Sequence, residues 1–321
     1  MRPRRTSSLA LLVPFSLLAG CSSSSAPIAQ TAVPPSAAAV AARTPGGGLI
    51  YASSFGANTV GYYLKDSGPS YPLAGSLSGS LDNPWGMTVD RNDNLYVANA
   101  QDENVLVYAQ GSTSPTNTLE DPNKFPCDVA VGADGTVYVA NGSGTMFSSG
   151  NVVIYPQGAS EPTQTLNNGH FYHVAGLALD KASNLFVSYN VFGAGDTGGV
   201  VEFKAPDFKH TTDMHVSLGY AGGVGFDRAG HLLVVDQKVP SLNVYKVGTR
   251  TPIAALPLPG TSWFFAFNQK STTLYVADSA LGEIDIFSYT PTALTQIGKI
   301  TSGLGPSNDD FGVADTPPQA L

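Results

Sequence analysis

The sequence is poor in charge, and in positive charge above all. Lys and Arg number 16 against 24 Asp and Glu, charged residues make up 12% of the 321 residues, and the formal net charge is −8. Binding to a nucleic-acid backbone needs a basic face. The charge balance therefore argues against DNA or RNA as a partner.

Cysteine and long apolar runs are also scarce. Cys21 and Cys127 are the two cysteines, too few for the disulfide framework that staples small secreted domains. The first apolar run, residues 9–18, is interrupted by Pro14 and Ser16 and is too short to span a bilayer as a helix. The hydrophobic fraction is 42%, so a core can form without disulfides.

Residues 1–20 are predicted to be an export signal. Three arginines among the first five residues precede the apolar run, and the first acidic residue is Asp66. Residues 18–21 have the sequence Leu-Ala-Gly-Cys, which resembles the lipobox of bacterial lipoproteins. The resemblance implies cleavage before Cys21 and acylation of that cysteine. An ordinary signal peptide with a chance cysteine is the alternative.

Residues 21–48 are predicted to be a disordered tether behind the acylated Cys21. They are mostly Ser, Ala, Pro and Gly, which cannot bury enough apolar surface to fold. Several acyl chains hold a protein stably at a membrane, whereas one holds it only marginally. Ser22 follows the cysteine, and by resemblance to lipoprotein sorting in two-membrane bacteria this favours the outer membrane. We therefore expect a lipid-anchored protein of the cell envelope, with the membrane as one partner.

From residue 49 onward a short hydrophobic β-run is repeated. The first copy is Leu49–Ser53, with the sequence Leu-Ile-Tyr-Ala-Ser, and the second is Leu95–Asn99, with Leu-Tyr-Val-Ala-Asn. The later copies begin at Val137, Leu185, Leu232 and Leu274. A repeat of about 40–50 residues with several strands in each unit is typical of a propeller.

Each copy is predicted to be the second strand of a four-stranded unit. An inner strand such as Gly86–Asp90 precedes it, followed by a turn rich in Asn, Asp and Gly. A third strand follows, as at Val105–Tyr108, and a weaker fourth, as at Pro115–Leu119. Over residues 49–315 this pattern resembles the NHL-type and lactonase-like six-bladed β-propellers. The resemblance implies an all-β fold of six antiparallel blades.

The first copy of the repeat lacks an inner strand, and the C-terminal region has a spare one. Phe311–Asp315, with the sequence Phe-Gly-Val-Ala-Asp, matches the inner-strand pattern. We predict that this strand completes the first blade, so that residues 49–321 form one closed ring without free sheet edges. Five self-contained blades with loose ends are the alternative.

Aromatic side chains are expected at one mouth of the central channel, where the inner strands begin. Trp85, Trp263 and Phe311 share one position of the repeat in three consecutive blades. Across the channel we expect Tyr172, His173 and Tyr220. Apolar clefts with a few polar groups are the usual ligand sites, and these rings would suit sugars or aromatic compounds. Packing of the rings between blades is the more ordinary interpretation.

Carboxylates are expected at the same mouth. Asp128 begins one inner strand, and Asp309 and Asp310 precede another. Six-bladed lactonases hold a divalent metal with channel carboxylates and amides, so the resemblance implies a calcium or zinc site. Its ligands would be Asp128, Asp309, Asp310 and Asn83, with His173 as the base. The set has no channel Glu, and the plainer interpretation is that Asp128 accepts backbone N–H bonds at a strand start.

No other motif points to chemistry. Cys127 is expected to be a small buried residue, and acids repeated at strand ends, such as Asp90, are expected to serve turns. The sequence has no phosphate-binding loop and no zinc-ligand spacing. We therefore expect a binding or scaffold module for a protein, peptide or glycan that needs no cofactor. The alternative is a metal-dependent, lactonase-like hydrolase or lyase at the channel mouth.

Overall fold

The computed structural model describes residues 48–142, 149–191 and 197–316. The chain divides into two units, residues 1–33 and 34–321, and all described residues belong to the second. The predicted signal peptide, Cys21 and the tether up to residue 47 lie outside the described residues. Within these residues, no helix has the length and apolar character needed to cross a bilayer.

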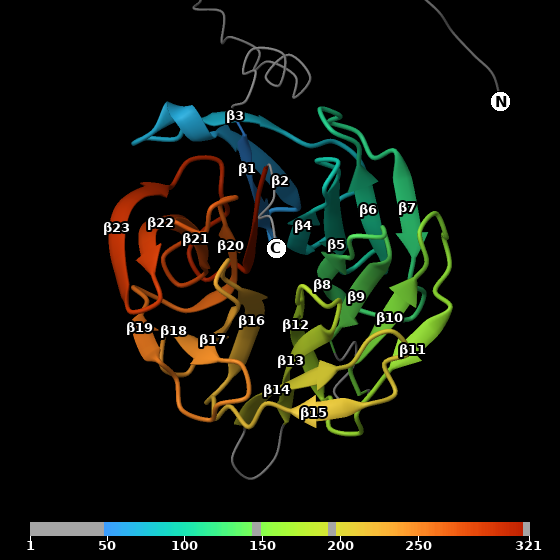
Figure 1. Ribbon diagram of the computed structural model, residues 1–321. Helices are drawn as coiled ribbons and strands as arrows, with labels where there is room; N and C mark the ends of the chain where they lie inside the picture. The colour runs from blue at the N-terminus through green and yellow to red at the C-terminus, as the bar shows by residue number, and fades with distance from the viewer. Residues whose placement is uncertain (1–47, 143–148, 192–196, 317–321) are drawn as a thin grey trace, which may run out of the picture. The chain divides into compact units, whose positions relative to one another are not determined.

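In the described part of the chain, 24 strands form six four-stranded antiparallel blades around a central axis (Figure 1). Blade 1 comprises β24 (Phe311–Asp315), β1 (Leu49–Ser54), β2 (Thr59–Leu64) and β3 (Leu73–Ser76), with a short 3₁₀ turn η1 (Lys65–Ser67). Blade 2 comprises β4 (Pro84–Val89), β5 (Leu95–Asn99), β6 (Asn104–Tyr108) and β7 (Asn117–Glu120). Blade 3 comprises β8 (Pro126–Val131), β9 (Val137–Asn141), β10 (Asn151–Tyr155) and β11 (Gln164–Leu166).

The remaining blades repeat this order. Blade 4 comprises β12 (His173–Leu179), β13 (Leu185–Val191), β14 (Thr197–Phe203) and β15 (Thr211–Asp213). Blade 5 comprises β16 (Ala221–Phe226), β17 (His231–Asp236), β18 (Ser241–Lys246) and β19 (Ala254–Pro257). Blade 6 comprises β20 (Ser262–Phe267), β21 (Thr273–Asp278), β22 (Glu283–Thr290) and β23 (Ala293–Ile300). The predicted six-bladed, all-β fold is confirmed.

The turns after the inner strands are held by the repeated acids. Asp90 Oδ1 accepts the backbone N–H groups of Asn92 and Asn94, and Asp180 Oδ1 accepts those of Ala182 and Asn184. A short side chain of this kind replaces backbone partners that a tight turn leaves unpaired. The prediction that these acids serve turns is confirmed.

The C-terminal strand closes the ring as predicted. β24 pairs antiparallel with β1, so that Val313 lies opposite Ala52 and Ala314 opposite Tyr51. Beyond this ladder, Thr316 N–H donates to the Leu49 carbonyl, just as Asp90 N–H donates to that of Asn94 in blade 2. The structural repeat in blade 1 therefore starts at Ile50, one residue later than the sequence match suggests.

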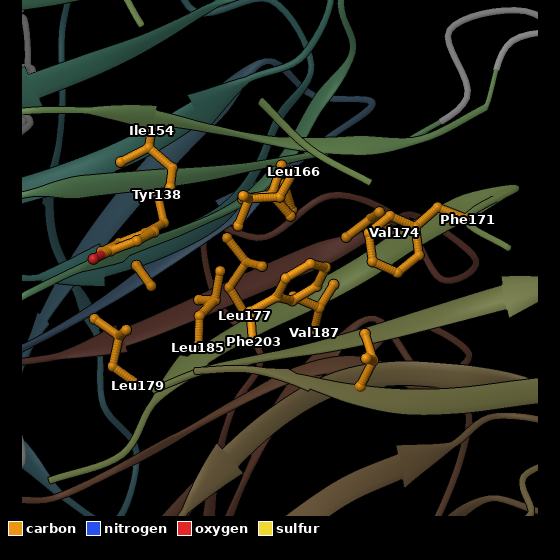
Figure 2. Packing of buried hydrophobic residues seen from close by; sticks show 14 of the residues in the cluster. Tyr138, Ile154, Leu166, Phe171, Val174, Leu177, Leu179, Leu185, Val187 and Phe203 are labelled. Atoms are coloured by element: carbon orange, nitrogen blue, oxygen red, sulfur yellow. The ribbon is translucent and has the colours of Figure 1, made fainter. Parts of the chain in front are cut away.

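The core consists of six hydrophobic clusters, one at each interface between neighbouring blades. Figure 2 shows the interface of blades 3 and 4, where Tyr138, Ile154 and Leu166 face Leu177, Leu179 and Leu185. The cluster between blades 6 and 1 joins β21 and β22 to β24 through Phe311 and Val313. Because every blade packs on two neighbours, the hydrophobic core itself runs around the closed ring.

Five inner strands differ from the sixth near their first residues. β4, β8, β12, β16 and β20 each have a β-bulge there, whereas β24 pairs with β1 without a shift of register. A bulge inserts one extra residue and changes the direction of the side chains around it. In β4 and β20 the bulges contain Trp85 and Trp263, so these two strands direct a tryptophan toward the channel mouth.

Candidate functional site

Aromatic rings gather where the inner strands begin, as the sequence predicts. Trp85 and Trp263 meet edge to face, with ring centroids 5.0 Å apart. His173 lies 6.2 Å from Trp85 and 5.7 Å from Trp263, and Tyr220 lies 5.8 Å from Trp263. Tyr172, half-buried, directly precedes His173 on the chain. The rings from blades 2, 4, 5 and 6 thus converge on one place.

Two further rings that sequence reasoning missed complete this group. Phe55, which follows β1, lies 5.4 Å from Trp85, and Phe125, which precedes β8, lies 6.1 Å from it. Phe125 shares one position of the repeat with His173 and Tyr220, and this position could have identified it. Phe55 lies in a loop after β1 that has no matched position, so the repeat gave no signal for it. The mouth cluster consists of Phe55, Trp85, Phe125, His173, Tyr220 and Trp263. Trp85 is buried and the other five are half-buried.

Phe311 does not join the mouth cluster. It is fully buried between blades 6 and 1, in one cluster with Ile50, Ile284 and Val313. The reason is the missing bulge in β24, because regular alternation puts Phe311 on the same face of the strand as Val313. Packing between blades, the ordinary interpretation of these rings, therefore describes Phe311.

Two ring nitrogens in the mouth cluster are buried without a hydrogen-bond partner, Trp85 Nε1 and His173 Nε2. Burial lowers the pKa of His173 to about 4, so the imidazole is neutral at physiological pH. Its ring packs on Gly142, where an added Cβ would lie 2.8 Å from His173 Cε1. A buried polar group without a partner costs about 1–3 kcal/mol.

The two acids before β24 have separate structural contacts. Asp310 Oδ1 accepts the indole N–H of Trp263 at 2.7 Å, and burial raises the pKa of Asp310 to about 6. Asp309 accepts from the Ser54 hydroxyl and from Gly56 N–H. Asp310 thus orients a ring of the mouth cluster, while Asp309 fixes the loop after β1.

Asn83 and Asp128, the other predicted metal ligands, are also engaged. Asn83 Nδ2 donates to the Phe55 carbonyl at 2.9 Å, and Asp128 Oδ2 accepts Leu177 N–H from the next blade at 2.9 Å. The described residues contain no group of three or more His, Cys, Asp or Glu that could hold a metal ion. Acceptance of a backbone N–H by Asp128 agrees with the plainer interpretation, and the metal site stays a prediction.

Cys127 lies beside Asp128 in the wall of the ring. Its thiol donates to the Val174 carbonyl at 3.0 Å, and it is 1% exposed. Burial, with the neighbouring Asp128 charge, raises the pKa of the Cys127 thiol well above its usual value. Cys127 is therefore a packed, protonated thiol, in agreement with its expected role as a small buried residue.

The central channel contains two adjoining cavities. One, of about 180 Å³, is lined by residues of the inner strands that include Asp128, Phe264 and Val313. The other, of about 270 Å³, lies toward the ends of these strands, where Asp90, Arg91, Asp180 and Lys181 line it. Both are lined by Thr88 and Ala130. Small side chains such as Ala130 and Thr88 therefore leave room along the channel axis.

Comparison with known proteins identifies the fold and no family. No family model and no curated protein matches the chain. Hydrazine synthase of Kuenenia stuttgartiensis matches with a TM-score of 0.58 and 17% identity over 82% of this chain and 85% of the other. A putative 6-phosphogluconolactonase of Bacteroides fragilis matches with a TM-score of 0.57 and 14% identity, over 85% of this chain and 99% of the other. A chain of a nidogen/laminin complex matches with a TM-score of 0.65 and 12% identity, over 86% of this chain and 100% of the other.

Proposed function

We propose that this propeller is a non-catalytic binding module that recognises a glycan at the mouth cluster. The observation that carries the proposal is the convergence of six rings, five of them half-buried, on one end of the channel. Sugar rings present apolar faces that stack on aromatic side chains, and such rings contribute about 0.5–1.5 kcal/mol each beyond burial. A peptide or protein partner is the alternative that the experiment below separates from a glycan.

The two unpartnered nitrogens favour a ligand with hydroxyl groups. Trp85 Nε1 can only donate, and His173 Nε2 can donate or accept according to its tautomer. A hydroxyl acts as donor and acceptor at once, so sugar hydroxyls can satisfy both nitrogens and recover the cost of their burial. A purely apolar ligand would leave both nitrogens without a partner.

The contacts of the predicted catalytic and metal-binding side chains support a non-catalytic role. His173 is surrounded by rings and Gly142, Asp310 holds Trp263, and Asp309 holds the loop after β1. A lactonase-like mechanism would need Asp309 and Asp310 to exchange these bonds for a metal ion. The propeller fold shared with a putative 6-phosphogluconolactonase is no argument for this activity, because the two chains are only 14% identical.

Intrinsic fluorescence provides a specific assay for glycan binding. The chain has two tryptophans, and both belong to the mouth cluster, so their emission reports on this site alone. We expect a screen of oligosaccharides, including those of bacterial cell envelopes, to contain one that shifts the emission and gives saturable binding. Trp263→Ala should weaken its binding about fivefold, for a loss of about 1 kcal/mol. Tyr71→Ala, which removes a half-buried ring outside the cluster, should leave the affinity unchanged.

Two results would redirect the proposal. Saturable binding of peptides, with no response to any oligosaccharide, would assign the mouth cluster to a peptide or protein partner. Stoichiometric calcium or zinc in the purified protein, lost in Asp310→Asn and accompanied by lactone hydrolysis, would replace the binding module with the metal-dependent enzyme.

We further propose that Cys21 carries a lipid anchor that places the propeller on the cell envelope, in the outer membrane of a two-membrane bacterium. The Leu-Ala-Gly-Cys sequence and the following Ser-rich segment support this. Cells fed an alkyne fatty acid should incorporate the label into the protein, and Cys21→Ser should abolish labelling and release the protein from the membrane fraction. Labelling that survives in Cys21→Ser would exclude this anchor.

A further inference from the structure

The channel is a second candidate site, separate from the mouth cluster. Most of the side chains that line the 180 Å³ cavity are apolar, among them Met87, Leu177 and Phe265, and Asp128, Asp315 and backbone groups add polar surface. Its lining includes Phe264 at the level of the mouth cluster, and the ring centroid of Phe264 lies 6.1 Å from that of Trp85. Away from the cluster it adjoins the 270 Å³ cavity at the ends of the inner strands. The mouth cluster therefore adjoins one end of the channel, and the polar residues of the wider cavity line the other.

Asp128 places a carboxyl group among these apolar side chains. Its side chain is buried, with 7% of the residue exposed, and one oxygen accepts Leu177 N–H. None of the ion pairs found among the described residues includes Asp128. Asp315, the other carboxyl group that lines this cavity, differs because it pairs with Lys65 at 2.7 Å.

A buried carboxylate is stable only when its charge is compensated. The backbone N–H groups of Leu177 and Val129 compensate Asp128 in part, and burial outweighs them and raises its pKa to about 7. A cationic ligand would supply the remaining compensation, and the cavity beside Asp128 gives that ligand space. The apolar side chains of the lining, such as Leu177 and Phe265, would contact a hydrophobic remainder of the ligand.

We propose that the channel binds a primary alkylamine, with the ammonium group on the Asp128 carboxylate and the alkyl chain against the apolar side chains of the lining. The wider cavity gives access from the end lined by Asp90, Arg91, Asp180 and Lys181. The site differs from the mouth cluster in its position and in the charge of its ligand, so its test does not depend on whether the mouth cluster binds a glycan.

The test compares butylamine and hexylamine with the alcohols of the same length by calorimetric titration at about pH 8, where Asp128 is mostly ionised. We expect each amine to bind at least tenfold more tightly than its alcohol. Asp128→Asn keeps an acceptor for Leu177 N–H but removes the charge, so it should weaken amine binding at least tenfold. Asp121→Asn, which changes a buried carboxyl group outside the channel, should change amine affinity less than twofold.

A second variant tests the location without changing charge. Thr88 lines both cavities and is half-buried, so Thr88→Phe should fill the channel and abolish binding while the thermal unfolding transition is retained. Equal affinity for amine and alcohol, full binding by Asp128→Asn, or full binding by a folded Thr88→Phe would each overturn the proposal.

Discussion

The ion pair at the ring closure gives the sharpest test of the fold. Lys65 follows β2, and its ammonium lies 2.7 Å from Asp315 Oδ2 at the end of β24. The Asp315 side chain is 1% exposed, so its charge depends on Lys65 for compensation. We predict that Lys65→Met destabilises the propeller strongly at alkaline pH and weakly at acidic pH.

The magnitude follows from the titration of Asp315. Burial outweighs the attraction of Lys65 and raises the pKa of Asp315 to about 7 in the folded chain, from 3.8. The folded state then binds the extra proton between these values, so stability falls as pH rises through this window. Removing Lys65 raises the pKa of Asp315 in the folded chain further. At a pH above the folded and unfolded pKa values, each additional pKa unit lowers the free energy of unfolding by about 1.4 kcal/mol. Breaking a buried pair typically costs about 3–5 kcal/mol.

The assay is urea unfolding followed by circular dichroism, at about pH 5 and about pH 9. Near pH 5 Asp315 is protonated in both proteins, so Lys65→Met should lose about 1 kcal/mol or less. Near pH 9 the loss should reach about 3 kcal/mol. Lys209→Met removes an exposed pair with Asp207 at 3.8 Å and should cost under about 1 kcal/mol at both pH values. Equal losses for Lys65→Met at the two pH values would refute the reasoning.

Three further predictions concern the whole ring. A chain that ends at Gly305 lacks β24 and exposes an edge of β1, so it should lose the cooperative thermal transition. Unfolding at the same temperature as the full-length protein would exclude closure by β24. Burial raises the pKa values of Asp121 and Asp310 to about 6 and those of Asp128 and Asp285 to about 7. The folded state therefore binds more protons than the unfolded state, and the free energy of unfolding should fall from about pH 5 to about pH 8. A rise over this range would contradict the prediction. Burial lowers the pKa of His173 to about 4, so this one group acts in the opposite direction and is outweighed by the four carboxyl groups. Cys127 should resist iodoacetamide in the native protein and react after unfolding; native labelling would show that the thiol is accessible.

The fold could be predicted from the sequence because its determinants are local and repeated. Hydrophobic β-runs such as Leu95–Asn99 and turn acids such as Asp90 recur in the blades, and each copy specifies the same hairpin. The missing inner strand before Leu49 and the spare one at Phe311 together predict closure, which is the one non-local feature. Its register was predictable only to within one residue, because β24 lacks the bulge of the other inner strands.

The mouth cluster was predictable only in part, and the bulges explain the difference. Sequence alignment gives Trp85, Trp263 and Phe311 equal positions, but only the first two lie in bulges that direct them toward the channel mouth. A bulge depends on pairing with the neighbouring strand, so no local pattern in the sequence marks it. Phe125 shares the repeat position of His173 and was within reach of the sequence, whereas Phe55 reaches Trp85 from a loop whose course depends on the assembled ring.

The closing strand and the mouth cluster are joined by hydrogen bonds. The Ser53 hydroxyl accepts Gly312 N–H at 2.8 Å and donates to the Trp85 carbonyl at 2.6 Å, so it links β24, β1 and β4. One residue before β24, Asp310 holds the indole of Trp263. Each tryptophan is thus fixed through the segment that closes the ring. A ligand that requires both indoles in this arrangement therefore binds the closed ring in preference to an open one, and its binding stabilises closure by mass action.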